Sequence, residues 1–495
     1  MSLFSSCNGQ ARVRLVQVGS ALAVACFFAG CGAGYRPVVS PINPTGPASQ
    51  PTAFVSVVSS SSTSSPGIVT VIDYSGDTIA AQAPIGPGPT SFTLDETGSS
   101  GYTVNSDGTL TNFPVSPTLQ AKNVQFTTLP LGAHLVNLFA PSAGLWAADL
   151  NGNVVDVLSG FPASFKLAVP TAETPVMVIG SGLVSERTYA ISQNITDPSG
   201  VGCNTSPRTV SGVGEAEAIE QTSHTISARL ALGKCPVYAV VSGDSRRIFV
   251  LNRGDDTVTV INAQNNTLDA CTPFLNQNGQ LVTCHPSLPL SSSAGLTGAS
   301  VPAIAGPVYA EYNAATSQLI VSDYDGNSVT VIDVSLDIYG NDSSTFGTTF
   351  SIPVGHNPAS VTALFDGTRA YAANQSDSTV TEVNLLSHTP IKTLPVNGHP
   401  RTVVSVQNSL YGKVYVAAPD SPYITIIRTD QDIIDTTVLV QGNVVDVRTS
   451  NQNGSQGNAI VVSRKPGFGQ PCYLPPTLLS PAAIAANPAA CSKLP

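Results

Sequence analysis

The sequence is poor in charged residues, which make up only 11% of its 495 residues, and it has two methionines and one tryptophan. Acidic residues outnumber basic ones by 31 to 21, and the body of the chain has no cluster of lysine and arginine. Because nucleic-acid binding depends on neutralising phosphates, no nucleic acid is expected as a partner. The chain also lacks a Cys-x-x-Cys pair, a Cys-x-x-Cys-His haem signature and a Gly-x-Ser-x-Gly nucleophile elbow. A non-enzymatic role is therefore favoured.

The N-terminus has the pattern of a secretory signal. Arg12 and Arg14 are its only charges, an apolar run extends from Leu15 to Gly30, and Cys31 follows directly. Small residues immediately before a cysteine resemble the bacterial lipobox, which implies acylation of the Cys31 thiol and anchoring in a lipid bilayer, with the outer membrane as the default. An ordinary signal peptide followed by a coincidental cysteine remains the alternative.

Composition divides the chain into four parts. Residues 1–30 are interpreted as the signal peptide, and residues 31–52 as the lipidated cysteine followed by a Pro- and Ser-rich tether. Residues 53–470 hold 40–50-residue units rich in Val, Thr, Asn and Gly, and residues 471–495 form a Pro/Ala-rich tail. A long N-terminal anchor and tether would leave the third part as the folded body.

A hairpin pattern repeats along that body. Two β-branched runs flank a polar turn, as in LIVSDYDGNSVTVIDV at Leu319–Val334, which predicts paired strands. The start of this turn, Asp323-x-Asp325-Gly326, also resembles a calcium loop, but it lacks the downstream glutamate and is interpreted as a turn. The same pattern recurs at Arg247–Asn262, Ala370–Asn384 and Val414–Arg428.

A second marker, a Gly followed by a short insert and often Pro, repeats in phase with the hairpins at Gly86, Gly132, Gly233, Gly355 and Gly398. Four short strands per unit of this length predict an all-β fold, a β-propeller of four-stranded blades. The order Tyr/Phe-Val-x-Asn, polar turn, T-V-T-V-I-D, G-x-x-P resembles the YVTN-type repeat of the lactonase-like and cytochrome d1-like propellers.

We count eight blades, with seven as the alternative because the unit from Pro175 to Leu232 is irregular and has GEAEAIE where a strand should be. The first unit lacks its innermost strand. Either Val444–Thr449 or Ala459–Ser463 could supply it and close the ring.

Six of the nine cysteines follow the signal region, and an even number in an exported chain favours disulfides. Pairing by proximity in sequence gives Cys203–Cys235, Cys271–Cys284 and Cys472–Cys491, although six cysteines allow fifteen connectivities.

Three histidines fall in the inter-unit insert, namely His134, His356 and His399, and Cys235 lies in a fourth copy of it. If these inserts met at the mouth of the channel, the imidazoles could bind a transition metal such as copper or zinc. The alternative is that the insert tolerates any small polar residue, and no cofactor is otherwise expected.

The sequence is thus expected to encode an exported, lipid-anchored propeller that acts as a binding or scaffolding module at the cell envelope. Its partner would be an envelope protein or surface ligand of unknown identity, bound by loops such as 268–306. The alternatives are a lactonase-like hydrolase working at the central channel and a metal- or redox-linked propeller.

Overall fold

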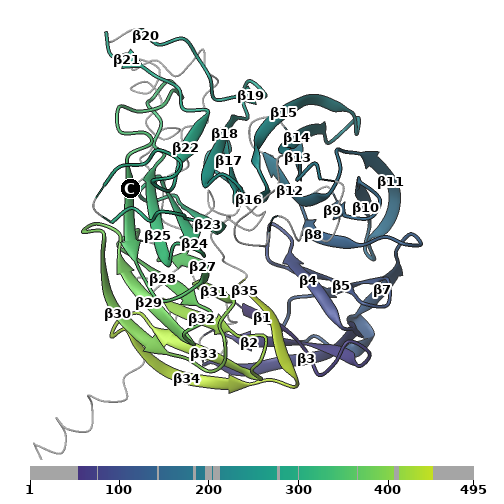
Figure 1. Ribbon diagram of the computed structural model, residues 1–495. Helices are drawn as coiled ribbons and strands as arrows, with labels where there is room; N and C mark the ends of the chain where they lie inside the picture. The colour runs from purple at the N-terminus through teal and green to yellow at the C-terminus, as the bar shows by residue number, and fades with distance from the viewer. Residues whose placement is uncertain are drawn as a thin grey trace, which may run out of the picture.

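The computed structural model describes residues 54–74, 76–141, 144–181, 186–195, 203, 212–275, 279–298, 300–364, 366–405 and 412–449. These residues form eight antiparallel sheets of at least four strands, arranged as blades around a central axis (Figure 1). The predicted all-β propeller with eight blades is confirmed, and the seven-bladed alternative is wrong. No helix in the described ranges is long and apolar enough to cross a membrane.

Each blade contributes one strand to the wall of the channel. These innermost strands are β4 (Pro89–Leu94), β8 (Leu135–Phe139), β12 (Pro175–Ser181), β16 (Pro236–Val241), β23 (Pro307–Asn313), β27 (Pro358–Ala363), β31 (Thr402–Ser405) and β35 (Asn443–Thr449).

The second strands are β1 (Phe54–Ser60), β5 (Ser100–Asn105), β9 (Leu145–Asp149), β13 (Arg187–Ser192), β17 (Arg247–Asn252), β24 (Gln318–Asp323), β28 (Arg369–Asn374) and β32 (Lys413–Ala417). The third strands are β2 (Pro66–Asp73), β6 (Thr109–Pro114), β10 (Val154–Ser159), β14 (Val213–Glu220), β18 (Thr257–Asn262), β25 (Ser328–Asp333), β29 (Thr379–Asn384) and β33 (Tyr423–Arg428).

The outer strands are β3 (Thr78–Pro87), β7 (Gln125–Thr128), β11 (Ser164–Pro170), β15 (Ile226–Lys234), β19 (Thr267–Leu268), β26 (Thr349–Pro353), β30 (Thr389–Pro395) and β34 (Ile433–Leu439). One insertion adds β20 (Phe274–Leu275), β21 (Leu281–Val282) and β22 (Ser287–Pro289), of which β22 pairs with β18. A short 3-10 helix, η1 (Ala121–Asn123), precedes β7.

The ring closes through its two chain ends. β35, the last described strand, pairs antiparallel with β1 and becomes the innermost strand of the first blade. Figure 1 shows the yellow-green end of the chain beside the purple start. Of the two candidates for the missing strand, Val444–Thr449 therefore fills the place, and Ala459–Ser463 lies outside the described residues. Closure in this way leaves no open gap between the first and last blades.

The apolar core lies between blades, so the middle strands are buried on both faces. Phe249, Leu251 and Val260 of one blade pack with Ala310 and Val321 of the next, and all five side chains are fully buried. Burial on both faces explains why these strands read as continuous apolar runs rather than as alternating ones.

The irregular fourth unit is a complete blade. GEAEAIE, which the sequence pattern did not favour as a strand, lies in β14 between β13 and β15. Its Glu217 is fully buried, where Ser192 Oγ donates to Glu217 Oε2 at 3.2 Å, and Arg229 lies 3.4 Å from Glu217 Oε1. Buried polar partners therefore allow an acidic segment to occupy a central strand position.

Candidate functional site

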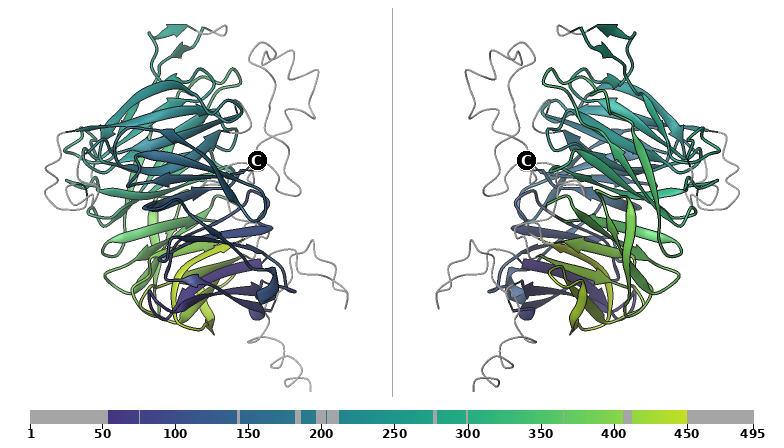
Figure 2. Two further views of the ribbon diagram at one scale, coloured as in Figure 1. Left: turned by 90° about the vertical axis from the view of Figure 1, so that its right-hand side faces the viewer. Right: turned by 90° about the vertical axis from the view of Figure 1, so that its left-hand side faces the viewer.

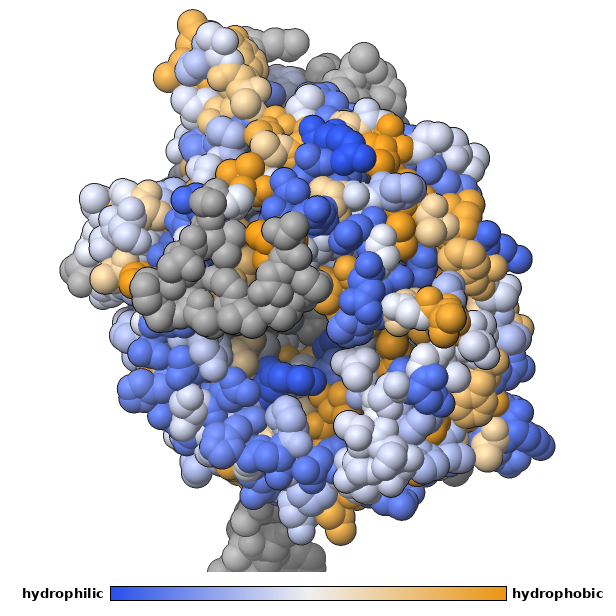
Figure 3. Space-filling view, turned by 45° about the vertical axis from the view of Figure 1, so that its right-hand side comes forward, coloured by the Kyte–Doolittle hydropathy of each residue, from blue (hydrophilic) through white to orange (hydrophobic). Residues whose placement is uncertain are grey.

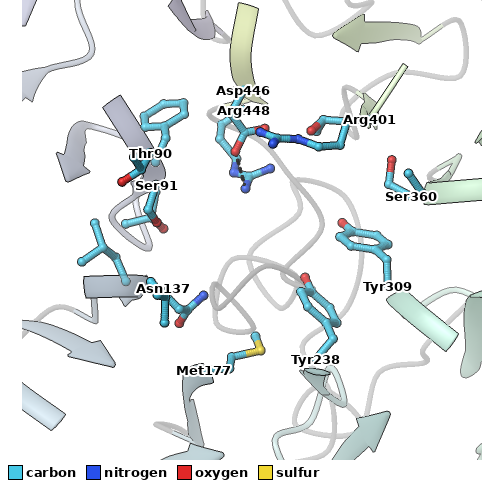
Figure 4. A pocket seen from close by; sticks show the side chains of 16 residues that line it. Thr90, Ser91, Asn137, Met177, Tyr238, Tyr309, Ser360, Arg401, Asp446 and Arg448 are labelled. Carbon is cyan, nitrogen blue, oxygen red and sulfur yellow. Dashed lines mark ion pairs between the residues drawn. The ribbon is translucent and has the colours of Figure 1, made fainter. Parts of the chain in front are cut away.

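The central channel holds a cavity of about 250 Å³, and all eight innermost strands contribute to its walls. Figure 4 shows side chains from opposite sides of the ring pointing into this common space. Clefts at the axis of a ring of strands are frequent ligand sites because many elements can place side chains there. The channel is therefore the first candidate site.

The same sequence position supplies the channel lining in every blade. It lies two residues after the marker proline, or its equivalent, at the start of the innermost strand. In most blades the strand has a β-bulge just before this position, which redirects the side chain. We call these eight residues the ring positions: Ser91, Asn137, Met177, Tyr238, Tyr309, Ser360, Thr402 and Asp446.

Three ring side chains are bonded to the next blade. The backbone N–H of Val178 donates to Asn137 Oδ1, that of Ala239 to Met177 Sδ, and that of Val403 to Ser360 Oγ, each at 3.0 Å. Each donor lies one residue beyond the ring position of its own blade. These bonds hold adjacent innermost strands together and fix the orientation of the ring side chains.

Charge in the channel comes from two arginines and one aspartate. Arg448 Nη2 lies 2.7 Å from Asp446 Oδ2, and both side chains are largely buried, at 17% and 11% exposure. Arg401 donates from Nη2 to the backbone carbonyl of Val445 and remains exposed. The lining thus carries a net positive charge, although the chain as a whole carries −10.

Two tyrosines form the opposite side of the channel. The rings of Tyr238 and Tyr309 are 4.8 Å apart between centroids and tilted by 33°. Burial raises the pKa of Tyr238 well above its ordinary value, and the neighbouring Tyr309 adds to the rise. Tyr238 therefore stays protonated at physiological pH.

The three histidines of the inter-unit insert are not brought together. The backbone N–H groups of His356 and His399 donate to Asp377 and Asp420 of their own blades at 2.6 and 2.7 Å. Their Nδ1 atoms lie 2.9 and 2.5 Å from the same aspartates, with the side chains 70% and 60% exposed. Each imidazole is thus held on a turn of its own blade rather than over the channel.

His134 follows the same rule, since its backbone N–H donates to Asp149 Oδ1 at 2.9 Å. Across the described part of the chain, no group of three or more His, Cys, Asp or Glu side chains is placed to hold a metal ion. The ring of imidazoles expected from His134, His356 and His399 is therefore not assembled there. The reason is local, because the backbone N–H of each histidine donates to an aspartate at the end of the second strand of its blade or in the turn after it.

Cys235 is offset by one residue from His356. It lies directly before Pro236, as Asn357 lies before Pro358, and both have a left-handed φ, 50° and 53°. His356 corresponds instead to Lys234, whose backbone N–H donates to Asp255 Oδ2 at 3.1 Å. Relative to the marker proline or its equivalent, Cys235 therefore corresponds to His134 and His399, which directly precede Leu135 and Pro400, but not to His356.

Two of the three expected disulfides are present. Cys203 pairs with Cys235 and Cys271 with Cys284, each with a Cα–Cα distance of 5.5 Å. Such bonds indicate an oxidising compartment, as expected of an exported protein. Cys472 and Cys491, like the candidate lipidation site Cys31, lie outside the described residues.

The second disulfide closes a projecting hairpin, which we call the finger, comprising residues 271–275 and 279–284. Its strands β20 and β21 pair with each other away from the ring, as the side views in Figure 2 show. Phe274, Leu275 and Leu281 on these strands are 43%, 68% and 63% exposed. The sequence from Cys271 to Cys284 contains no charged residue, and orange surface is prominent on this projection in Figure 3.

A buried ion cluster holds the root of the finger. Arg247 Nη2 of β17 lies 3.1 Å from Asp269 Oδ1 and 3.2 Å from Asp342 Oδ1, and all three side chains are at most 2% exposed. His285 Nδ1 lies 2.7 Å from Asp342 Oδ2, and its ring stacks on Phe346 at 5.2 Å. Burial raises the pKa of Asp342 to about 6, with Asp269 adding to the rise. The root is therefore tied to two blades.

The sequence did not reveal the channel residues, although a signal for them was present. Tyr238, Tyr309 and Ser360 each lie two residues after a proline of the marker or its equivalent. The missing information was the bulge, which decides that this position faces the channel rather than a neighbouring blade.

Comparison with known proteins supports the fold and does not indicate an activity. No family model matches the chain, and no curated protein matches it. One similar solved structure is apo AztD from Citrobacter koseri, with 11% identity and a TM-score of 0.53 over 80% of this chain and 97% of that one. Another is dihydro-heme d1 dehydrogenase NirN in complex with DHE, with 12% identity and a TM-score of 0.55 over 85% of this chain and 80% of that one. Sqt1 from Saccharomyces cerevisiae has 8% identity and a TM-score of 0.51 over 72% and 87%. At such identities the likeness shows the propeller fold alone.

Proposed function

We propose that this protein is an exported, lipid-anchored module that binds a partner protein at the cell envelope through the finger. The observation that carries the proposal is a rigidly rooted hairpin whose outer side chains are apolar and exposed. A monomeric protein gains nothing in stability from exposing Phe274, Leu275 and Leu281 together on one projection. Contact with a partner would remove these side chains from water.

The rooting of the finger favours a binding role. A hairpin of two short strands is marginal by itself, but here a disulfide and the Arg247 cluster close its base. Order that exists before association reduces the entropy lost when a complex forms. A preorganised apolar projection therefore suits insertion into a groove on another protein.

We expect the finger to bind an apolar surface of a protein rather than an anionic membrane. Segments that bind membrane surfaces usually carry lysine or arginine beside their apolar side chains, and the finger has neither. The lipoprotein-like signal ending at Cys31 and the tether 31–52 support placement of the propeller near the envelope, where such a partner would be found.

The test is site-specific photocrosslinking in cells, with the crosslinker placed at Leu275. The control places it at Leu439, which is 58% exposed on β34 of another blade. We expect one discrete adduct from position 275, identified by mass spectrometry as an envelope protein, and its loss when Phe274 and Leu281 are both changed to Ser. Adducts to lipid alone, or equal labelling at both positions, would contradict the proposal.

The anchor has its own test. Labelling cells with a radioactive or alkyne-bearing fatty acid should tag the wild-type chain, and Cys31→Ser should abolish the tag and the membrane association. Retention of the tag in Cys31→Ser would exclude this cysteine as the acylated residue. The finger could still bind a partner in that case, so the two tests fail separately.

The hydrolase alternative has less support from the channel. Among the described side chains that line it, Asp446 is the single carboxylate, and it is ion-paired with Arg448. Hydrolysis of a lactone ring needs an acid or base free to move a proton. Assay of the purified chain against a panel of lactones, with Asp446→Asn as the variant, tests this alternative.

A further inference from the structure

We propose that the central channel binds a small anion that carries a carboxylate or phosphate group. The inference goes beyond the proposed partner binding, because the channel and the finger are separate features. It rests on the direction in which the ring side chains are bonded, on the charge of the lining and on the size of the cavity.

Two ring side chains, Asn137 and Ser360, each accept a backbone N–H from the next blade and keep a donor that can face the channel. The oxygen of the Asn137 amide accepts the N–H of Val178, so its two N–H donors are on the other side of the amide group. Ser360 Oγ likewise accepts the N–H of Val403, which leaves its own proton available for donation. Figure 4 shows the Asn137 nitrogen directed into the channel.

The charges in the lining add to this preference. Arg401 and Arg448 are both guanidinium groups that can bind an oxyanion with two parallel hydrogen bonds. Asp446 offsets one of these charges through its 2.7 Å pair with Arg448, so the lining carries a net charge of +1 by this count. A single negative charge on the ligand would balance it.

The cavity has room for a small molecule. A volume of about 250 Å³ lies below the range of typical drug-sized pockets, which start at roughly 300 Å³. Tyr238 and Tyr309 on the opposite wall offer ring faces for the uncharged part of the ligand. A monoanion of about the size of a sugar acid meets each of these conditions.

The test is isothermal titration calorimetry on the full chain with three probes, namely inorganic phosphate, gluconate and glucose. We expect phosphate or gluconate to bind, with affinity falling as salt rises, and glucose not to bind. Phosphate binding alone would assign the site to a phosphate group, and gluconate binding alone to a carboxylate. Equal binding of glucose and gluconate, or no binding of either anion, would overturn the proposal.

Two substitutions should change the affinity in opposite directions. Arg401→Gln removes the exposed guanidinium and should weaken binding at least tenfold. Asp446→Asn removes the competing carboxylate and should strengthen binding severalfold. The control, Arg229→Gln, removes an equal charge from a side chain on β15, outside the channel, and should leave the affinity unchanged.

A charge-conserving variant separates ligand binding from folding. Arg401→Lys keeps the positive charge and should bind more tightly than Arg401→Gln while having a similar melting temperature. If Arg401→Gln fails to fold, the Asp446→Asn result decides, because a weaker or unchanged affinity in that variant contradicts an anion site. An effect of Arg229→Gln as large as that of Arg401→Gln would also contradict it.

Discussion

Asp323 and Thr330 form a hydrogen bond at 2.5 Å, with Thr330 Oγ1 as the donor and Asp323 Oδ2 as the acceptor. In a neighbouring blade Asn374 has the equivalent place at the end of its second strand, and its Nδ2 donates to Thr381 Oγ1 at 2.8 Å. Asn252 and Thr259 repeat this bond, also at 2.8 Å. One blade therefore carries an acid where others carry an amide.

The first prediction concerns this acid. Burial raises the pKa of Asp323 to about 7, whereas an unfolded Asp titrates near 3.9. Because the pKa is higher in the folded state, the protonated Asp323 carboxyl contributes fully to the free energy of unfolding below about pH 4. This contribution is lost as the pH rises through about 7. Asp323→Asn should raise the free energy of unfolding at pH 8 and leave it nearly unchanged at pH 4.

Denaturant unfolding at several pH values measures this effect. The matched control is Asp325→Asn on the same turn, because the Asp325 side chain is 21% exposed and pairs with Arg253 at 3.3 Å. We expect a shallower pH slope for Asp323→Asn only. A loss of stability at pH 8 would show that the ionised carboxylate is tolerated in this pocket.

The second prediction concerns a glycine of the inter-blade marker. A Cβ at Gly355 would lie 2.7 Å from Asn374 Cγ, which is closer than two non-bonded carbon atoms can approach. Gly355→Ala should therefore destabilise the fold by about 1–3 kcal/mol, since the asparagine cannot move without losing its threonine bonds. Gly76→Ala, whose nearest neighbour would be 3.6 Å away, is the control for thermal unfolding.

The third prediction distinguishes the two disulfides. Cys203–Cys235 spans 32 residues and joins the start of an innermost strand, so its removal by a double Ser substitution should cost about 2–4 kcal/mol. The matched change at Cys271 and Cys284 should alter the propeller's melting temperature less, because the finger projects from the ring. Proteolysis of the finger should instead become faster. Equal shifts in melting temperature would contradict this separation.

The fourth prediction concerns the root of the finger. Arg247→Met leaves Asp269 and Asp342 buried without their shared cation, and it should cost about 3–5 kcal/mol in unfolding free energy. Lys166→Met, at an exposed side chain on β11, should cost at most about 1 kcal/mol. Chemical denaturation of both variants measures the difference. Similar costs would mean that the Arg247 cluster contributes little net stability.

Repetition made the architecture readable without a structure. The hairpins of Arg247–Asn262 and Ala370–Asn384 predicted strands β17, β18, β28 and β29 because short-range pairing depends on local residue types. The Asn and Thr of the repeat, together with the marker glycine, turn out to be one contact set, in which the glycine leaves room for the asparagine. Proximity in sequence likewise predicted both observed disulfides.

Features that depend on packing between blades could not be predicted in the same way. GEAEAIE is a strand because neighbouring strands and Arg229 satisfy Glu217, and no local pattern encodes those partners. His356 and His399 contact aspartates of their own blades, each 21 residues later in the chain.

The sequence by itself determined the kind of repeated unit and favoured eight of them over seven, because each blade is built from local strand and turn preferences. Only the tertiary structure decided what faces the channel. Tyr238, Tyr309 and Asp446 reach it through bulges in three different blades, and their meeting depends on closure of the ring by β35. Long-range closure brings together residues that are more than two hundred positions apart, and no pattern within one unit specifies which of them will meet.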